Sequence, residues 1–457
     1  MNNSSALIYA GKLRGVRAFT ALCLGQMVSM FGSHLTSFVL GVWIYQQTKS
    51  ATNFALISFF AITPEILLSP LAGAMVDRWD RRWLMIIGNL GAALAVLTLT
   101  VLEVAGRLGV WPTYAVVAVS SAFQAVQYPA LSASTPLLVP VHHLSRANGA
   151  VELGNAAALM VAPITAALFL SAIGLSGVFL LNIVTLAFAI AVLLVSEIPV
   201  PAAAAGERGI GLLRQAAEGW TYIKMRREFL GLLILFAAIN LAFGMVQVLL
   251  PPLVLSFASS LALGSVMSCA GLGLLAGSLL MSILGSPRRK VRTVLTLALI
   301  QGLVLFLGVS RLSVPLVGGA AFLFSVCTIT IVVISQTIWQ TEIPQAIQGR
   351  AFAIRRLIAW STLPAAYLAA GPLADRVFEP LLASKGLLAA SFGLFIGTGQ
   401  GRGIALLFVL MGAVMVTAVC IASRYRPFWE LESRMLDGTH RQTRTANCSL
   451  PSGACNG

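Results

Sequence analysis

Long stretches without Asp, Glu, Lys or Arg recur along this chain of 457 residues. A helix rises about 1.5 Å per residue, so roughly 20 apolar residues cross the hydrocarbon core of a membrane. Only 10% of the residues are charged, compared with about 25% in soluble domains. Because so little polar surface cannot cover a globule of this size, the sequence predicts an all-α integral membrane protein.

Twelve membrane-spanning helices are predicted from these uncharged stretches. Two stretches are long enough for two helices each: Leu153–Ser196, with a break at Ser171–Gly177, and Phe229–Pro287, with a turn near Phe257–Leu261. The eight single spans are Ala18–Thr48, Ala51–Val76, Trp83–Leu102, Leu108–Ser145, Val294–Ser310, Leu312–Thr341, Leu357–Ala374 and Gly403–Ser423.

The distribution of basic residues predicts that both termini are cytoplasmic. In that orientation all but six of the 30 Lys and Arg residues lie on the cytoplasmic side, as the positive-inside rule requires. The formal net charge of +15 therefore reflects loops at the inner membrane surface, and we expect no nucleic-acid partner. The six residues outside are Lys49, Arg107, Arg311, Arg376, Lys385 and Arg402.

A polar interruption divides the spans into two sets of six. It covers residues 197–228 and ends in a segment with the apolar spacing of an amphipathic helix on the membrane surface. A weak internal repeat agrees with a duplication, since Val139-Pro140 precedes Arg146 at the same distance as Ile343-Pro344 precedes Arg350. The predicted domains are a cytoplasmic N-terminal segment (1–17), two six-helix halves (18–196 and 229–424), the linker (197–228) and a disordered cytoplasmic tail (425–457).

The loop between the second and third spans carries the most specific motif. Residues 73–82 read GAMVDRWDRR, which resembles the GxxxDRxGRR loop of the major facilitator superfamily. Asp80 replaces the second glycine, and this variant is similar to the branch that includes macrolide-efflux and enterobactin-export proteins. The segments 31–59, 69–82, 342–356 and 369–375 also resemble that branch. The resemblance covers residues 15–425 and implies a two-half transporter in the inner membrane of a bacterium.

A conformational gate is expected around this loop. Gly73 permits close approach of another helix, and Asp77, on the same face, can accept hydrogen bonds from a helix N-terminus. The resemblance implies that the partner is the eleventh helix, which begins near Arg350. The simpler alternative is a generic positively charged inner loop. The remaining gate candidates are Arg78, Arg81 and Arg82 in the loop and Glu152, which is expected to pair with the basic residues 288–290.

Two titratable side chains near the middle of the spans are the candidates for proton coupling. Glu65 lies 12 residues from both Asn53 and Asp77, or about 18 Å of helix each way. His34 lies at a similar depth in the preceding span, and imidazole titrates near neutral pH. The alternatives are a permanently protonated structural carboxyl for Glu65 and a packing contact for His34. The fifth helix keeps Pro163 but lacks the glycines of the proton-antiporter motif.

Neutral polar and aromatic side chains are expected to line a largely apolar substrate cavity. The alternative for each of the polar ones is hydrogen bonding between helices. The sequence also predicts that Arg355 and Arg356 extend to the inner membrane surface. The cavity candidates are Phe31, Gln124, Gln127, Asn240, Gln247, Gln336 and Trp360.

The combined pattern predicts a secondary transporter. The GxxxxGK[ST], HExxH and GxSxG motifs are all absent, so we expect no nucleotide hydrolysis, catalytic residues, metal or cofactor. The favoured function is proton-coupled efflux of a bulky amphipathic small molecule by a monomer. An uptake symporter and a non-transporting membrane receptor or assembly factor are the alternatives.

Overall fold

A computed structural model describes residues 3–139, 144–196, 221, 223–343, 345–383, 386, 388, 397 and 399–436, and every regular element in these ranges is helical. The predicted all-α class is confirmed for them. The helices are α1 (Asn3–Thr48), α2 (Ala51–Arg78), α3 (Arg81–Val104), α4 (Val110–Gln124), α5 (Gln127–Leu138), α6 (Leu144–Val195), α8 (Arg227–Phe257), α9 (Ser260–Leu284), α10 (Lys290–Gly308), α11 (Val314–Glu342), α12 (Gln345–Pro372), the π-helix η2 (Leu373–Phe378), α13 (Glu379–Leu381) and α15 (Arg402–Ser423).

Nine stretches within the described helices are long and apolar enough to cross a membrane, in α1, α2, α3, α6, α8, α9, α10, α11 and α15. The long α6 contains the break that the sequence predicts. Gly174 adopts a φ of 68° there, a left-handed conformation that favours glycine. The segments on either side of Gly174 are therefore separate helices that share one element label.

A second break differs from the prediction. The sequence predicts one span over Leu108–Ser145, whereas the structure has α4 and α5, separated at Ala125 and Val126. Pro129 lies in the first turn of α5, and its ring nitrogen cannot donate a hydrogen bond to the carbonyl of Ala125. Gln124 therefore ends one helix and Gln127 begins the next.

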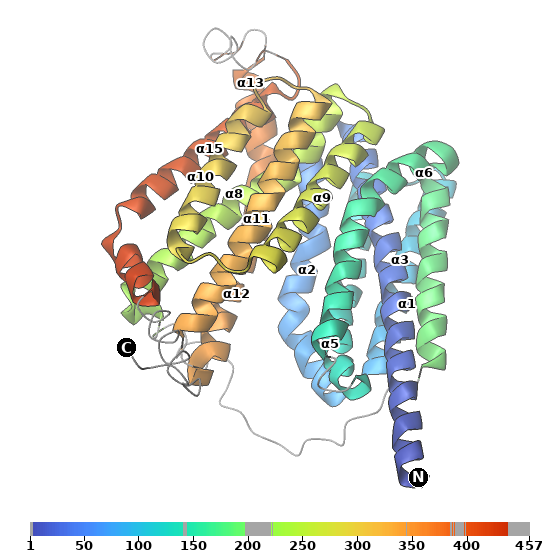
Figure 1. Cartoon of the computed structure of the whole chain (residues 1–457). Helices are drawn as coiled ribbons and strands as arrows, with labels where there is room; N and C mark the ends of the chain where they lie inside the picture. The colour runs from blue at the N-terminus through green and yellow to red at the C-terminus, as the bar shows by residue number, and fades with distance from the viewer. Residues whose placement is uncertain are drawn as a thin grey trace, which may run out of the picture.

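The helices form two groups that stand side by side, α1–α6 and α8–α15 (Figure 1). In the first group α1 packs along α6 and α2 along α4, and in the second α9 packs against α11 and α10 against α15. The groups meet where α6 contacts α9 and where α2 contacts α12. We call the end of the molecule that carries α13 the upper end, and the opposite end, where α1 begins, the lower end (Figure 1).

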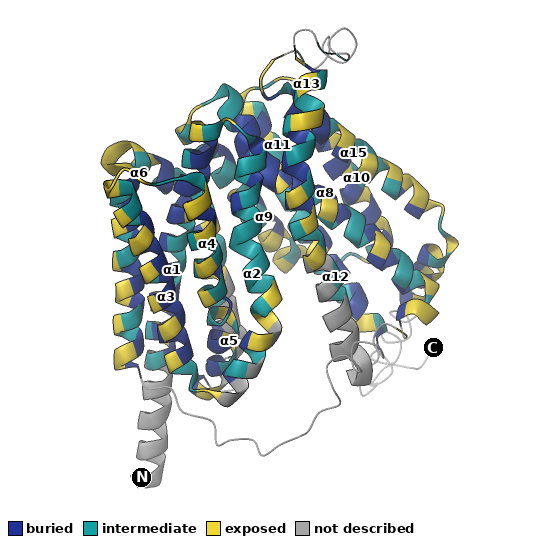
Figure 2. Ribbon diagram, turned by 180° about the vertical axis from the view of Figure 1, so that it is seen from behind, coloured by how far each residue is buried: buried dark blue, intermediate teal, exposed yellow. Residues whose placement is uncertain are grey.

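Exposed apolar side chains cover the outward faces of the helices. On α3, Leu90, Leu94, Leu97 and Val101 are 46–59% exposed and follow one another at helical spacing. Figure 2 shows such exposed positions along the outer helices, with the buried positions turned inward. An apolar stripe of this length on the outside of a protein suits contact with lipid.

The structure describes only parts of the predicted N-terminal segment, linker and C-terminal tail. Residues 1–2, 197–220, 222 and 437–457 lie outside the described residues, so most of the predicted linker and tail is not included. Helix α1 begins at Asn3 and so includes the predicted N-terminal segment. Residues 426–436 were expected to belong to a disordered tail, but they form a helix in which Phe428, Leu431 and Met435 are buried.

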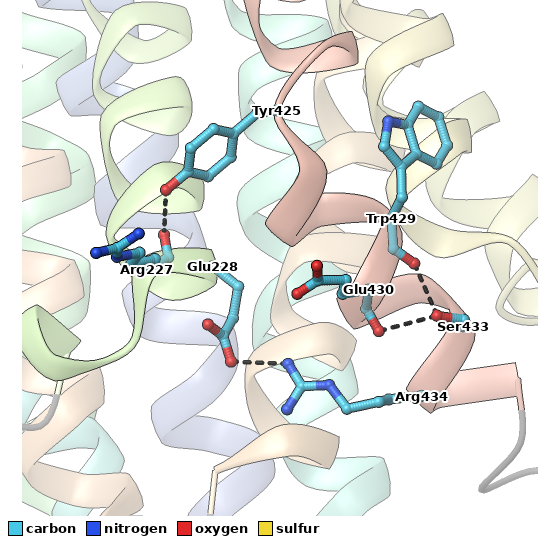
Figure 3. A network of polar contacts seen from close by, with 7 residues as sticks. All are labelled: Arg227, Glu228, Tyr425, Trp429, Glu430, Ser433 and Arg434. Atoms are coloured by element: carbon cyan, nitrogen blue, oxygen red, sulfur yellow. Dashed lines mark hydrogen bonds and ion pairs between the residues drawn. The ribbon is translucent and has the colours of Figure 1, made fainter.

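Polar contacts hold this helix against the start of α8 (Figure 3). Arg434 forms an ion pair of 2.7 Å with Glu228, and the Tyr425 hydroxyl donates to the carbonyl of Arg227 at 3.2 Å. Burial raises the pKa of Glu228, but the hydrogen bond and positive charge of Arg434 outweigh burial and lower it. The ion pair therefore contributes stability above the ordinary carboxyl pKa, and loses it as the pH falls through the lowered pKa of the folded state.

We expect packing, rather than charge, to hold the 426–436 helix in place. Phe428 is 1% exposed, so Phe428→Ala should cost about 3–5 kcal/mol of local stability. The Arg434 side chain is 52% exposed, so Arg434→Ala should cost about 0–1 kcal/mol. Limited proteolysis of the purified protein should cleave near residue 428 much faster in the first variant than in the second. Equal cleavage rates in the two variants would contradict this ranking.

Candidate functional site

A polar cavity lies among the helices of the first group. It has a volume of about 250 Å³ and is lined from α1, α2, α4, α5 and α6. A second pocket of about 110 Å³ shares Ser33, Ser37, Glu65 and Gln124 with it. We call the two together the Glu65 cavity. The sequence-predicted residues that line it are His34, Glu65, Gln124 and Gln127.

Hydrogen bonds fix the two glutamines at the break between α4 and α5. The Gln127 amide donates to Asn89 Oδ1 at 2.9 Å, and the Gln124 amide donates to Ser120 Oγ at 3.1 Å. Asn89 on α3 is fully buried and also accepts from Ser29 at 3.1 Å. The sequence interpretation missed Asn89, although it is an isolated polar residue in an apolar span. These contacts favour a role for Gln127 in holding helices together.

A larger cavity lies among the helices of the second group. Its volume is about 430 Å³, and its lining comes from α8, α10, α11 and α12. Two predicted cavity residues, Asn240 and Gln336, lie in its wall, together with Phe236, Phe243 and Trp339. The cavity is therefore mostly apolar, with a few polar groups. We call it the Arg355 cavity, after the only charged side chain among its described lining residues.

The position of Arg355 corrects the sequence interpretation. Its Nη1 donates to Gln336 Oε1 at 2.7 Å and its Nη2 to Ser335 Oγ at 2.9 Å. The guanidinium also lies 5.4 Å from the centre of the Trp339 ring. Helix α12 begins at Gln345, so Arg355 lies about 15 Å along the helix. There the side chain binds polar groups of α11, rather than extending along its own helix toward the membrane surface as predicted.

Gln247 and Phe31, two further predicted cavity residues, lie outside both cavities in the structure. Gln247 accepts a hydrogen bond of 3.0 Å from the Tyr367 hydroxyl and lines a different pocket of about 180 Å³. Phe31 packs against the apolar core of the first group. The side chain of Trp360 lies outside those that the structure describes. Gln247 therefore joins α8 to α12 and does not face the Arg355 cavity.

The two groups are held together at the upper end by a contact that the sequence interpretation missed. The Asp375 carboxylate, in η2, accepts hydrogen bonds from the Ser50 hydroxyl at 2.6 Å and from the backbone N–H groups of Ala51 and Thr52 at 3.0 and 2.8 Å. These donors form the N-terminus of α2, where a negative charge is favourable. We call this contact the Asp375 cap. One turn earlier, a Cβ added to Gly371 would lie 2.5 Å from the Cα of Thr52.

Gly73, Arg81 and Arg82, the predicted gate residues that the structure describes, make no such contact with a described residue of the other group. A Cβ built on Gly73 would have no described atom within 4 Å, and the side chains around Arg350, expected to lie opposite it, are outside the described ones. Arg81 donates to the carbonyl of Ala133 at 2.7 Å, and Arg82 donates to that of Leu194. Both contacts stay inside the first group. The side chains of Asp77, Arg78, Glu152 and Arg350 lie outside those that the structure describes.

Comparison with known proteins identifies relatives of this arrangement. The family model described as Major Facilitator Superfamily matches residues 22–367. Macrolide efflux protein A of Streptococcus pyogenes is 24% identical over 370 residues, which are 79% of this chain and 90% of that protein. The multidrug efflux pump Tap of Mycolicibacterium fortuitum is 24% identical over 373 residues, 78% of this chain and 88% of Tap.

Solved structures have a similar fold. One of them is a bacterial homologue of the human lysosomal transporter Spinster, in an inward-facing and unoccupied conformation. It has a TM-score of 0.65 and is 14% identical in sequence. The similarity covers 93% of this chain and 98% of that one. At this identity the likeness concerns the fold alone.

Proposed function

Because this chain belongs to the major facilitator superfamily, we propose that it is a secondary exporter that uses the proton gradient to expel bulky amphipathic molecules. Membership makes it a multi-pass membrane transporter and not an enzyme. The efflux proteins among its relatives support the outward direction. The observation that carries the proposal is the pair of cavities, one in each helix group, below the Asp375 cap that joins the groups at the upper end.

We propose twelve spans, with α4 and α5 forming one, α6 forming two at Gly174, and α12 included. The lower end is assigned to the cytoplasm of a bacterial cell, because the basic loop at residues 77–82 lies there. The two six-helix halves are the two helix groups. The conformation is then inward-facing, with the Asp375 cap closing the outer side. Closure of the inner side would engage Gly73, Asp77, Arg78 and Arg350, with Glu152 facing the basic residues 288–290.

Glu65 and His34 are the proposed coupling groups, since both line one cavity between the helices of the first group. A proton that enters from outside would neutralise Glu65, and its release to the cytoplasm would reset the cycle. The protein is proposed to act as a monomer, with one substrate path between its halves.

Flux in inside-out membrane vesicles tests the proposal. Vesicles that contain the protein should accumulate radiolabelled erythromycin or ethidium when respiration acidifies their interior, and a protonophore should abolish the accumulation. Vesicles without the protein are the control. Uptake into right-side-out vesicles instead would support a symporter, and no flux in either orientation would favour a non-transporting receptor.

Cysteine labelling tests the orientation. Ser313 and Ser286 are both exposed, in loops at the upper and lower ends of the second group. In a cysteine-free background, we expect Ser313→Cys in intact cells to react with a membrane-impermeant maleimide at least tenfold faster than Ser286→Cys. After permeabilisation the two rates should become similar. The reverse order in intact cells would overturn the assignment of the lower end to the cytoplasm.

A further inference from the structure

The helices around the Arg355 cavity are almost free of acidic residues. Over their whole lengths, α8, α10, α11 and α12 contain only Glu228 and Glu342, one in the first turn of α8 and the other at the last residue of α11. Glu228 forms its ion pair with Arg434. The walls of the cavity therefore supply no carboxylate to neutralise Arg355.

Among the described side chains the hydrogen-bond partners of Arg355 are neutral, so they hold its side chain without compensating its charge. The guanidinium has five N–H donors, and Gln336 and Ser335 accept from two of its nitrogens. The face of Trp339, 5.4 Å away, attracts the cation weakly. A charge inside an apolar cavity is costly unless an opposite charge accompanies it. A ligand that brings a negative group would therefore gain more here than in water.

The rest of the cavity suits the apolar body of such a ligand. Phe236, Phe243 and Ile331 supply aromatic and aliphatic surface, and Asn240 adds a neutral polar group. The volume of about 430 Å³ lies within the range of small-molecule sites, about 300–1,000 Å³. A guanidinium such as that of Arg355 can also hold a planar carboxylate in a two-pronged geometry that a lysine cannot make.

We propose that the Arg355 cavity binds amphipathic organic acids, with the guanidinium of Arg355 holding the carboxylate and the walls of α8 and α11 holding the apolar body. The proposal rests on the proposed exporter function and names the class of substrate at that site.

Matched acids and esters test this inference by isothermal titration of the full-length protein in lipid nanodiscs. The probes are cholate with methyl cholate, and 1-naphthylacetate with its methyl ester; in each pair one methyl group replaces the negative charge and the apolar body is unchanged. The wild-type protein should bind each acid at least tenfold more tightly than its ester. Arg355→Gln should bring the ratio close to one, Arg355→Lys should restore part of it, and Arg107→Gln, at an exposed arginine outside the cavity, should leave it unchanged.

Three results would overturn the inference: failure of both acids to bind, an acid preference that survives in Arg355→Gln, or an equal loss of acid and ester affinity in that variant, as expected for a purely structural arginine. The vesicle assay separates these failures from failure of the exporter proposal. If ethidium or erythromycin is still expelled while neither acid binds, the exporter stands and the acid site does not. If nothing is expelled but the acids bind through Arg355, the exporter proposal fails by itself.

Discussion

We expect Glu65→Gln to abolish proton-driven efflux while the exchange of substrate down its own gradient continues. Glu65 lines both pockets of the Glu65 cavity, and His34 lies in the wall of one of them. A carboxyl inside a membrane-spanning helix can bind and release a proton, and this titration can be linked to conformation. Glutamine imitates the protonated acid but cannot release the proton.

Uphill efflux and downhill exchange should be measured in the same proteoliposomes. We expect uphill flux to fall at least 100-fold, with exchange changing less than threefold. Glu430→Gln, the same substitution at an exposed residue of the 426–436 helix, is the control and should keep both activities. Full uphill activity in Glu65→Gln would remove Glu65 from the coupling mechanism and leave His34 as the next group to substitute.

Asp375→Ala should open the outer side of the protein. The substitution removes a carboxylate that accepts three hydrogen bonds from the N-terminus of α2. A negative charge at a helix N-terminus contributes about 0.3–1 kcal/mol, and a hydrogen bond to a charged group contributes about 1.5–3 kcal/mol. The three donors belong to the other helix group. The substitution therefore destabilises the inward-facing conformation, in which the two groups are joined by this contact.

The opening should be visible at Ser37, which lines the Glu65 cavity. We expect an impermeant methanethiosulfonate, added from outside, to modify Ser37→Cys about tenfold faster when Asp375→Ala is present. Ser50→Ala removes only the hydroxyl donor and should give a smaller increase. An unchanged rate in Asp375→Ala would show that the cap does not hold the two groups together.

The helical class, the nine apolar stretches found in the described helices and the shared cavity of His34 and Glu65 agree with the sequence, because all three follow from counting along the chain. The depths of His34 and Glu65 come from helical rise, and consecutive spans bring the two residues near each other. The break at Gly174 is marked by glycine and serine between two apolar runs. The glutamine contacts to Asn89 depend on the rotation of α3, which apolar periodicity does not determine.

Three features are not visible in the sequence, each for a physical reason. The sequence places Arg355 near the membrane surface because the apolar run begins only at Leu357. The helix itself begins earlier, at Gln345, so Arg355 lies well inside it. Asp375 acts on residues more than 300 positions away, and the π-helix after Pro372 turns it out of the register of α12. The 426–436 helix has a polar average composition that hides the spacing of Phe428, Leu431 and Met435.

Distances between the two helix groups test alternating access most directly. Spin labels at Trp79 and Ser286 would report on the lower end, and labels at Arg107 and Arg311 on the upper end; all four positions are exposed. In nanodiscs, pulsed electron resonance should show the lower distance shortening and the upper distance lengthening when Glu65 is protonated at low pH or when Asp375→Ala removes the cap. Distances that stay fixed under both conditions, or that change in the same direction at both ends, would contradict the account.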